Sequence, residues 1–206
     1  MKKKAVKWIA IVLVVLLVVA GVGMFIFSRM MQNMMGGTVE LSYTHEAHEE
    51  ENGASVVYMT TEISPEALME IYAALGVELK GNNIAVKLST GEPPASNYLD
   101  PALIKDLVQS VYGTIVECNT AYGGSRSETA MHYQVAEDHG YTEIADVVIM
   151  DEDGSTTIPV EGGTHLKENY VGAHFPEYDG FLVLSHFKGH AMAGFGGAIK
   201  NISIGI

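Results

Sequence analysis

The chain has 206 residues, a formal net charge of −13, 48% apolar residues and one cysteine. This length allows one ordinary domain with a short appendage. An acidic chain repels phosphate, which excludes a nucleic-acid partner, and the apolar content without a short repeat excludes collagen-like, coiled-coil and disordered proteins. A single cysteine excludes an internal disulfide framework and a cysteine-only zinc or iron–sulfur site.

The charge is divided unevenly along the chain. Residues 1–35 sum to +5, whereas residues 36–206 sum to −18. The first part contains a run of 20 residues without a charge, residues 8–27, which is long enough as a helix to cross a hydrocarbon core of about 30 Å. We therefore predict a single transmembrane anchor over residues 8–28, with the lipid bilayer as a partner.

The flanks of this run predict its orientation. Four lysines precede it, in the basic flank 1–7, and only Arg29 follows closely. The positive-inside rule then predicts a cytoplasmic N-terminus and an extracytoplasmic body at the cell membrane. The alternative is a cleaved signal peptide, with Val18 and Ala20 as the small residues before the cut.

Residues 29–53 form a predicted acidic tether. His45 and His48 stand among carboxylates in this segment, an arrangement that suits either a divalent metal or a solvated linker. A globular domain is then expected over residues 54–206.

This domain is predicted to alternate strands with helices. Helix starts are indicated where Ser64 and Asp100 each precede a proline. The predicted strands are residues 55–60, 84–88, 114–118, 146–150, about 157–160 and 181–185, and the predicted helices are residues 65–75, 101–112 and 127–138. This alternation predicts an α/β fold with a mainly parallel sheet and flanking helices.

Open α/β sheets bind ligands beyond the carboxyl ends of their strands. Most of the few basic residues of the domain fall in or near the loops at that edge, which favours a small anionic ligand. A glycine-rich turn before a predicted helix adds exposed backbone groups. The candidate ligand-binding residues are Lys87, Asn119, Thr120, Arg126, Lys188, Gly196 and Gly197.

Several histidines are candidates for chemistry. His186 and His190 are four residues apart and suit metal ligation by nickel, iron or zinc, acid–base work, or a structural role bonded to the backbone. His132 and His139 are expected on the surface or at the end of the helix 127–138. Cys118 is expected to be a small core residue.

Three stretches carry a family resemblance: IAVKLSTGEPPASNYLDPALIKDLV, TIVECNTAYGGSRSETAMH and LSHFKGHAMAGFGGAIKNISIGI. They resemble domain-of-unknown-function family 362, from about Val56 to the last residue. The resemblance implies association with a ferredoxin-like four-iron four-sulfur segment. It also implies that the chain is cut short at Ile206, so that a cluster would depend on cysteines supplied by a further region.

A more distant similarity links the chain to the nickel-pincer lactate racemases. In that family a lysine that anchors the cofactor follows a histidine by ten residues, and His190 and Lys200 have this spacing. The resemblance makes His190 and Lys200 the candidate catalytic residues. The racemases place a histidine-arginine pair after the third strand, where this chain has Asn119-Thr120-Ala121-Tyr122.

Three hypotheses follow for function. The first is a membrane-anchored domain with a metal- or cofactor-dependent site for a small anionic ligand. The second is a non-catalytic module that binds an anion or a metal, and the third is an inactive fragment of an iron–sulfur redox protein. The sequence leaves open the substrate, the reaction and the oligomeric state.

Overall fold

A computed structural model of the protein describes residues 22–27, 56–94, 96–190 and 193–206. The chain divides into two units, Met1–Ala54 and Ser55–Ile206. The flank 1–7, the tether 29–53 and most of the predicted anchor 8–28 lie outside the described residues, and residues 22–27 are helical. Within the described ranges, no helix combines the length and the hydropathy needed to span a membrane.

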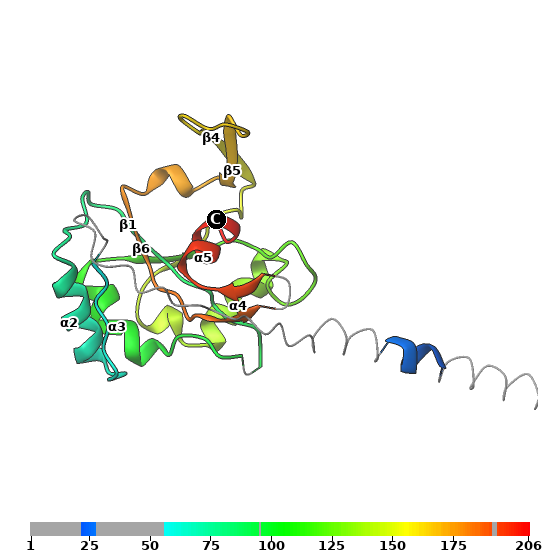
Figure 1. The fold of residues 1–206 in the computed structure, drawn as a ribbon, viewed down its shortest axis with the longest axis horizontal. Helices are drawn as coiled ribbons and strands as arrows, with labels where there is room; N and C mark the ends of the chain where they lie inside the picture. Colours follow the sequence, from blue (N-terminus) through cyan, green and yellow to red (C-terminus); the bar gives the residue numbers. More distant parts are fainter. Residues whose placement is uncertain (1–21, 28–55, 95, 191–192) are drawn as a thin grey trace, which may run out of the picture. The chain divides into compact units, whose positions relative to one another are not determined.

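The second unit is built on a four-stranded sheet (Figure 1). Its strands are β1 (Ile84–Lys87), β2 (Thr114–Glu117), β3 (Val147–Ile149) and β6 (Gly180–Val183), in the order β3-β2-β1-β6. All three pairings are parallel. Every residue of β1 is buried, as expected for a central strand of a parallel sheet covered on both faces. The predicted α/β fold with a parallel sheet is confirmed.

Three helices follow the predicted positions: α2 (Pro65–Leu75), α3 (Pro101–Ser110) and α4 (Thr129–Asp138). The Oγ atom of Ser64 accepts a hydrogen bond from the Ala67 N–H at 3.1 Å, and Oδ1 of Asp100 accepts one from the Ala102 N–H at 2.9 Å. These caps satisfy amides that have no partner within the helix, and proline follows each cap. Helices α2 and α3 lie side by side (Figure 1).

The two faces of the sheet pack against different elements. On one face, Val86 and Ile115 contact α3 and the 3₁₀ turn η1 (Tyr141–Glu143) in a cluster that includes Ile104 and Tyr141. On the other face, a smaller cluster around Val116 packs against the turn η2 (Phe175–Glu177) and the last residue of the chain. Apolar burial on both faces is what holds the short strands in register.

Two hairpins extend the fold. β4 (Ser155–Pro159) pairs with β5 (Glu168–Gly172), and β7 (Lys188–His190) pairs with β8 (Gly194–Gly196), both antiparallel. The short helix α5 (Ala198–Ile204) then ends the chain. The sequence predicts part of β4 and the helix after the glycine-rich turn. It does not predict β5, β7 or β8, whose exposed and glycine-containing sequences lack a clear alternating pattern.

The strand predicted over residues 55–60 is wrong. Residues 56–60 have no regular structure and are exposed; Val57, for example, is 85% exposed. The β-branched composition of this segment satisfies strand propensity, but a strand also needs a neighbour with which to pair. Both neighbours of β1 are other segments, β2 and β6, and neither edge strand pairs with residues 56–60.

Candidate functional site

A buried ion cluster lies at the carboxyl ends of β1 and β2. Lys87 ends β1 and is fully buried, and Glu117 ends β2 and is 5% exposed. The parallel register places Lys87 beside Val116, so the next residue, Glu117, comes close to it. Nζ of Lys87 and Oε1 of Glu117 are 3.9 Å apart. Charges at this depth are stable only with partners, and further polar groups surround the pair.

Glu117 is the anionic centre of this cluster. Its Oε1 accepts a hydrogen bond from Nη1 of Arg126 at 3.1 Å. Its Oε2 accepts the N–H and the hydroxyl of Thr90, both at 2.7 Å, and lies 3.2 Å from Nε2 of His132. Burial acts to raise the pKa of Glu117, but the hydrogen bond from His132 and the charges of Lys87 and Arg126 outweigh it and lower the pKa to about 2.

Arg126 joins a second carboxylate to the cluster. Its guanidinium donates to Oε1 of Glu92 through Nε, at 3.0 Å, and through Nη2. It also donates from Nη1 to Oγ of Ser89 at 3.3 Å. Burial acts to lower the pKa of Arg126, but the charges of Glu117 and Glu92 outweigh it and raise the pKa. Arg126 therefore has two carboxylate partners within the chain, Glu117 and Glu92.

Lys87 is held by the end of the chain as well as by Glu117. Its Nζ donates to the Leu88 carbonyl and to Oδ1 of Asn201, both at 2.8 Å. Burial lowers the pKa of Lys87. The backbone at Gly205 approaches so closely that a Cβ added there would lie 2.9 Å from Nζ. Helix α5 and the residues after it therefore cover the lysine.

Asn119 and Thr120 fix the loop between β2 and α4. The backbone N–H of Asn119 donates to Oδ1 of Asp151 at 2.8 Å, and its side-chain nitrogen, Nδ2, donates to Oγ1 of Thr129 at 2.9 Å. The Thr120 N–H donates to the Arg126 carbonyl at 2.8 Å. These bonds give both residues structural partners and place Arg126 at the cluster.

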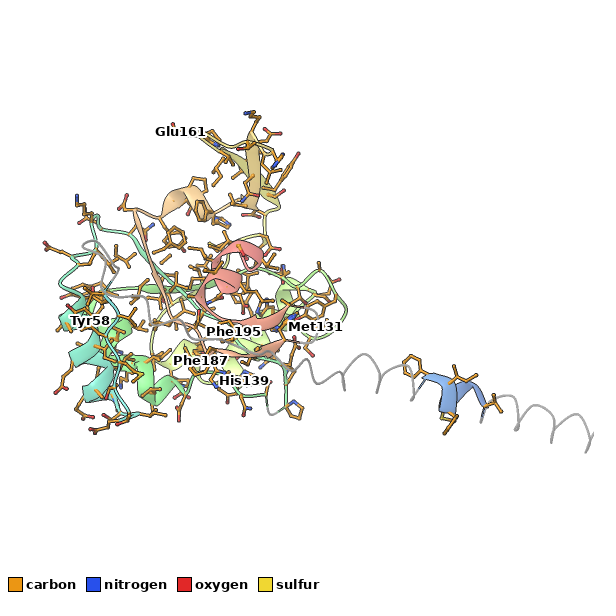
Figure 2. All side chains as sticks on the ribbon, viewed as in Figure 1. Tyr58, Met131, His139, Glu161, Phe187 and Phe195 are labelled. Atoms are coloured by element: carbon orange, nitrogen blue, oxygen red, sulfur yellow. The ribbon has the colours of Figure 1, made fainter. Side chains whose placement is uncertain are left out.

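The remaining predicted site residues gather on the β7–β8 hairpin and α5. His186 and Lys188 are exposed, and the rings of Phe187 and Phe195 lie 6.2 Å apart on the same hairpin (Figure 2). Because residues 188–190 form β7, His186 and His190 do not share one face of a helix.

The predicted catalytic pair lies close to one glycine. Gly196 is buried in β8, and a Cβ added there would lie 3.4 Å from Cδ of Lys200 and 3.9 Å from Cβ of His190. The structure therefore brings Lys200 and His190 to the same side of Gly196, where its hydrogen takes the place of a side chain. Nδ1 of His190 lies 3.1 Å from the Ala193 N–H, which donates to it.

Lys200 also lines a pocket of about 450 Å³. The other lining residues are Phe195, Gly197, Ala198, Ile199 and Ser203. Within the described residues, the ammonium of Lys200 makes no ion pair with a carboxylate. This pocket therefore offers a cation, a hydroxyl and backbone groups at a glycine.

A metal or cluster site would need several ligand side chains lying close together. Across the described ranges, no group of three or more His, Cys, Asp and Glu side chains could hold a metal ion. Metal ligation by His186 and His190 stays a prediction. Cys118 is the one cysteine; burial and then the charge of Asp151 raise its pKa to about 12, and it packs against the core as expected. One protonated thiol does not fit an iron–sulfur cluster, which is held by several thiolates.

Sequence reasoning missed the centre of the cluster. His132 and His139 were expected on the surface or at the end of the helix; His139 does cap the end of α4, but both side chains are buried, His132 completely. Glu117 was not singled out, although a carboxylate inside the apolar strand TIVEC was a usable signal, since strands of parallel sheets are buried on both faces. Lys87 and Arg126 were predicted at this edge, and the structure adds the carboxylates that bind them.

The comparisons with known proteins give one match. No curated protein and no solved structure matches the chain. Residues 84–206, more than half of the chain, match the family described as Domain of unknown function (DUF362). The matched region starts at the first residue of β1 and includes the ion cluster, the hairpin and α5. The chain therefore belongs to the DUF362 family.

Proposed function

We propose that this chain is a membrane-anchored domain that binds a small anionic ligand, a carboxylate or a phosphate, beside Lys200. The observation that carries the proposal is the contrast between the cations. Lys87 and Arg126 have carboxylates near them, whereas Lys200 lines a pocket and makes no ion pair within the part of the chain that the structure describes. An unpaired cation in an acidic domain is a natural point of attachment for an anion.

The surrounding charges favour the same ligand. The buried side chains of Lys87, Arg126 and Glu117 carry two positive charges and one negative charge. Glu92, with a side chain that is 42% exposed, offsets part of this excess from the surface. The charge of Lys200 also acts to lower the pKa of Lys87, which means that the two ammonium groups repel each other. An anion bound at Lys200 would reduce this repulsion.

His190 has the position of a proton-transfer group or of a metal ligand in this proposal. It approaches Gly196 from the same side as Lys200. The alternative role for His190, with His186, is ligation of nickel, iron or zinc, for which the rest of the ligand set would have to come from outside the described residues.

Non-catalytic capture of the anion is the second candidate. It is favoured by the lining of the Lys200 pocket, which includes no histidine or carboxylate among the described residues. Replacing His190 by Gln separates the candidates. If the site is catalytic, His190→Gln should lower the turnover rate and leave the ligand affinity unchanged. If the site only captures the anion, neither protein turns a substrate over, and ligand affinity is the one property that the variant can change.

Calorimetric titration of the full-length chain in detergent micelles tests the binding site. Inorganic phosphate and succinate are the probes, and Lys80→Gln is the matched control because Lys80 is exposed ahead of β1. We expect at least one probe to bind, with affinity reduced about tenfold or more in Lys200→Gln and unchanged in Lys80→Gln, since charge-assisted bonds are worth about 1.5–3 kcal/mol. Equal affinity in the wild type and in Lys200→Gln would contradict the proposal.

The anchor is tested separately. The uncharged run of residues 8–27 and the lysines before it support an extracytoplasmic domain. Protease added to intact cells should then degrade the domain, and a cytoplasmic control protein should survive. Survival of the domain until the cells are permeabilised would reverse the orientation.

A further inference from the structure

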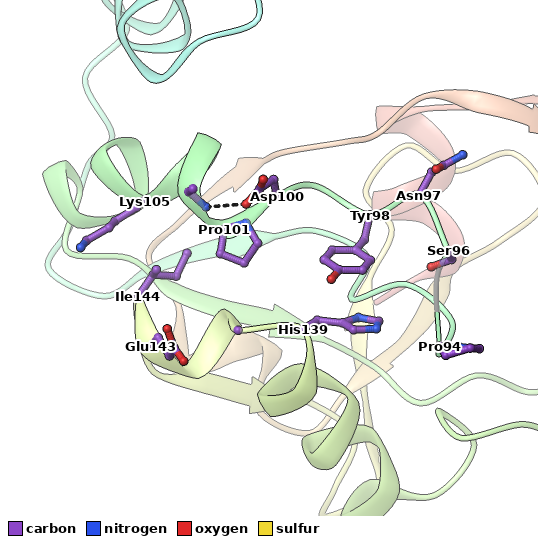
Figure 3. Close-up of a pocket in the computed structure, with 12 residues that line it drawn as sticks. Pro94, Ser96, Asn97, Tyr98, Asp100, Pro101, Lys105, His139, Glu143 and Ile144 are labelled. Atoms are coloured by element: carbon purple, nitrogen blue, oxygen red, sulfur yellow. Dashed lines mark hydrogen bonds between the residues drawn. The ribbon is translucent and has the colours of Figure 1, made fainter.

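A second pocket lies between the loop that follows β1 and the end of α4. Its volume is about 750 Å³, and the lining includes Pro94, Tyr98, Pro101, Lys105, His139 and Ile144 (Figure 3). None of its lining residues belongs to the Lys200 pocket. Proline, tyrosine and isoleucine give it flat apolar walls, and such walls with a few polar groups are typical of small-molecule sites.

One polar group of this pocket has a ring nitrogen whose hydrogen is placed by a bond to the backbone. His139 is 7% exposed, and its ring stacks on Tyr98 with centroids 3.9 Å apart and planes 10° apart. Its Nδ1 lies 2.6 Å from the Thr90 carbonyl oxygen. A carbonyl oxygen only accepts, so Nδ1 carries the hydrogen and donates it.

The other ring nitrogen is left without a donor. In a neutral ring protonated at Nδ1, Nε2 presents a lone pair. Nε2 of His139 is buried and has no hydrogen-bond partner anywhere in the described chain. Buried polar atoms nearly always have a partner. The ring edge that carries the nitrogens faces the Pro94 and Ser96 side of the pocket (Figure 3).

The orientation of His139 is maintained by the ion cluster. Thr90, which receives the Nδ1 hydrogen through its carbonyl, is itself bonded to Glu117 through its N–H and its hydroxyl. Thr90 is fully buried, so it does not turn away easily. The tautomer of His139 and the direction of its Nε2 are therefore already set in the free protein.

We infer that this pocket binds a small planar molecule, a nitrogen heterocycle or a phenol, that donates an N–H or O–H to Nε2 of His139. The flat face of the ligand packs against the proline, tyrosine and isoleucine side chains. The donor supplies the missing partner of Nε2, which is buried in the free protein, so binding requires the side chains over this nitrogen to move aside. This inference does not depend on anion binding at Lys200.

Pyrazole and 1-methylpyrazole are the matched probes, because they share a ring and differ in the N–H. Both are titrated into the full-length chain in detergent micelles while imidazole ¹⁵N resonances are recorded. The His139 signals are identified by their loss in His139→Asn. We expect Nε2 to resonate as an unprotonated nitrogen in the free protein and to shift on addition of pyrazole, which should bind about five to ten times more tightly than 1-methylpyrazole.

Two variants separate the ring nitrogens. Asn places an amide near the position of Nδ1 and has no atom at Nε2, whereas Gln reaches the position of Nε2. His139→Asn should bind both probes with equal affinity, and His139→Gln should keep part of the preference for pyrazole. Equal binding of the two probes to the wild-type chain would overturn the inference, as would an Nε2 signal that pyrazole leaves unchanged. His139→Gln gives the same assignment where His139→Asn fails to fold, and the relative affinity of the two probes for the wild-type chain needs neither variant.

Discussion

Glu117 and Lys200 are linked through Lys87 and Asn201, yet they are in opposite electrostatic situations. Glu117 is buried and receives hydrogen bonds or close charges from Lys87, Thr90, Arg126 and His132. Lys200 is half-buried, lines a pocket and makes no ion pair within the described residues. The comparison teaches that charge at the carboxyl edge of this sheet is compensated to different degrees. The partners of Glu117 join β1, β2 and the loop before α4, whereas Lys200 on α5 has no carboxylate partner among the described residues, and a ligand there is our proposal.

Loss of the Glu117 charge should have the largest effect. Glu117→Gln leaves Lys87 and Arg126 buried with less compensation, and removal of one partner from a buried ion pair costs about 3–5 kcal/mol. Urea unfolding at pH 7 measures the change, with the exposed Glu78→Gln as control, for which we expect a change below about 0.5 kcal/mol. Equal stabilities of the two variants would show that the cluster does not hold the fold together.

Lowering the pH should remove the stabilisation that the charge of Glu117 gives to the fold. The pKa of Glu117 in the folded protein is about 2, below its ordinary value of 4.5. A lowered pKa stabilises the fold above pH 4.5, and this stabilisation, of the order of 3 kcal/mol, is lost as the pH falls from 4.5 towards 2. The free energy of unfolding of the wild type should therefore fall more steeply over this range than that of Glu117→Gln. Parallel pH profiles of the two proteins would show that the acid sensitivity comes from groups other than Glu117.

Asn201 connects the buried cluster around Glu117 to helix α5, which carries Lys200. Its replacement should reduce the stability of the fold by an intermediate amount. Its Oδ1 accepts from Lys87 at 2.8 Å, and its Nδ2 donates to Oγ of Ser185 at 2.9 Å. Asn201→Ala leaves Nζ of Lys87 with one acceptor fewer, at a cost of about 1–3 kcal/mol. Hydrogen exchange should rise first in α5. Asn97→Ala, at an exposed asparagine, is the control, and an unchanged exchange rate in α5 would argue against this link.

Replacement of Lys200 should have the smallest effect on stability. Lys200→Gln removes a charge that repels Lys87 and breaks no ion pair within the described chain, so we expect a change within about 0.5 kcal/mol in urea unfolding. A loss above about 2 kcal/mol would assign Lys200 to the structural cluster and remove the contrast with Glu117.

Much of the framework was predictable because its signals are local. Ser64 and Asp100 before prolines indicate helix starts, and short apolar runs alternating with helices indicate a parallel sheet. Residues 56–60 have the composition of a strand but no neighbour with which to pair, and pairing is not a property of the segment itself. The β7–β8 hairpin was missed because glycine and exposed residues hide its alternation.

The position of the candidate site was predictable from the sequence, but the residues that pair with its cations were not. The loops that follow parallel strands meet at one edge, which is why Lys87 and Arg126 were expected there. Their pairing with Glu117 and Glu92 depends on contacts between distant segments. The burial of His139 likewise depends on the Thr90 carbonyl, 49 residues away along the chain. Ligand and metal roles for His186, His190 and Lys200 stay predictions.

Lysine acylation read by mass spectrometry tests the central claim most directly. The full-length chain is treated with a limiting acylating reagent, with and without phosphate or succinate at a concentration that saturates binding. Lys87, which is fully buried, should remain unlabelled, and Lys200 should be labelled without a ligand and protected with one, while the exposed Lys80 reacts equally in both. Labelling of Lys200 that a bound anion leaves unchanged would contradict the account.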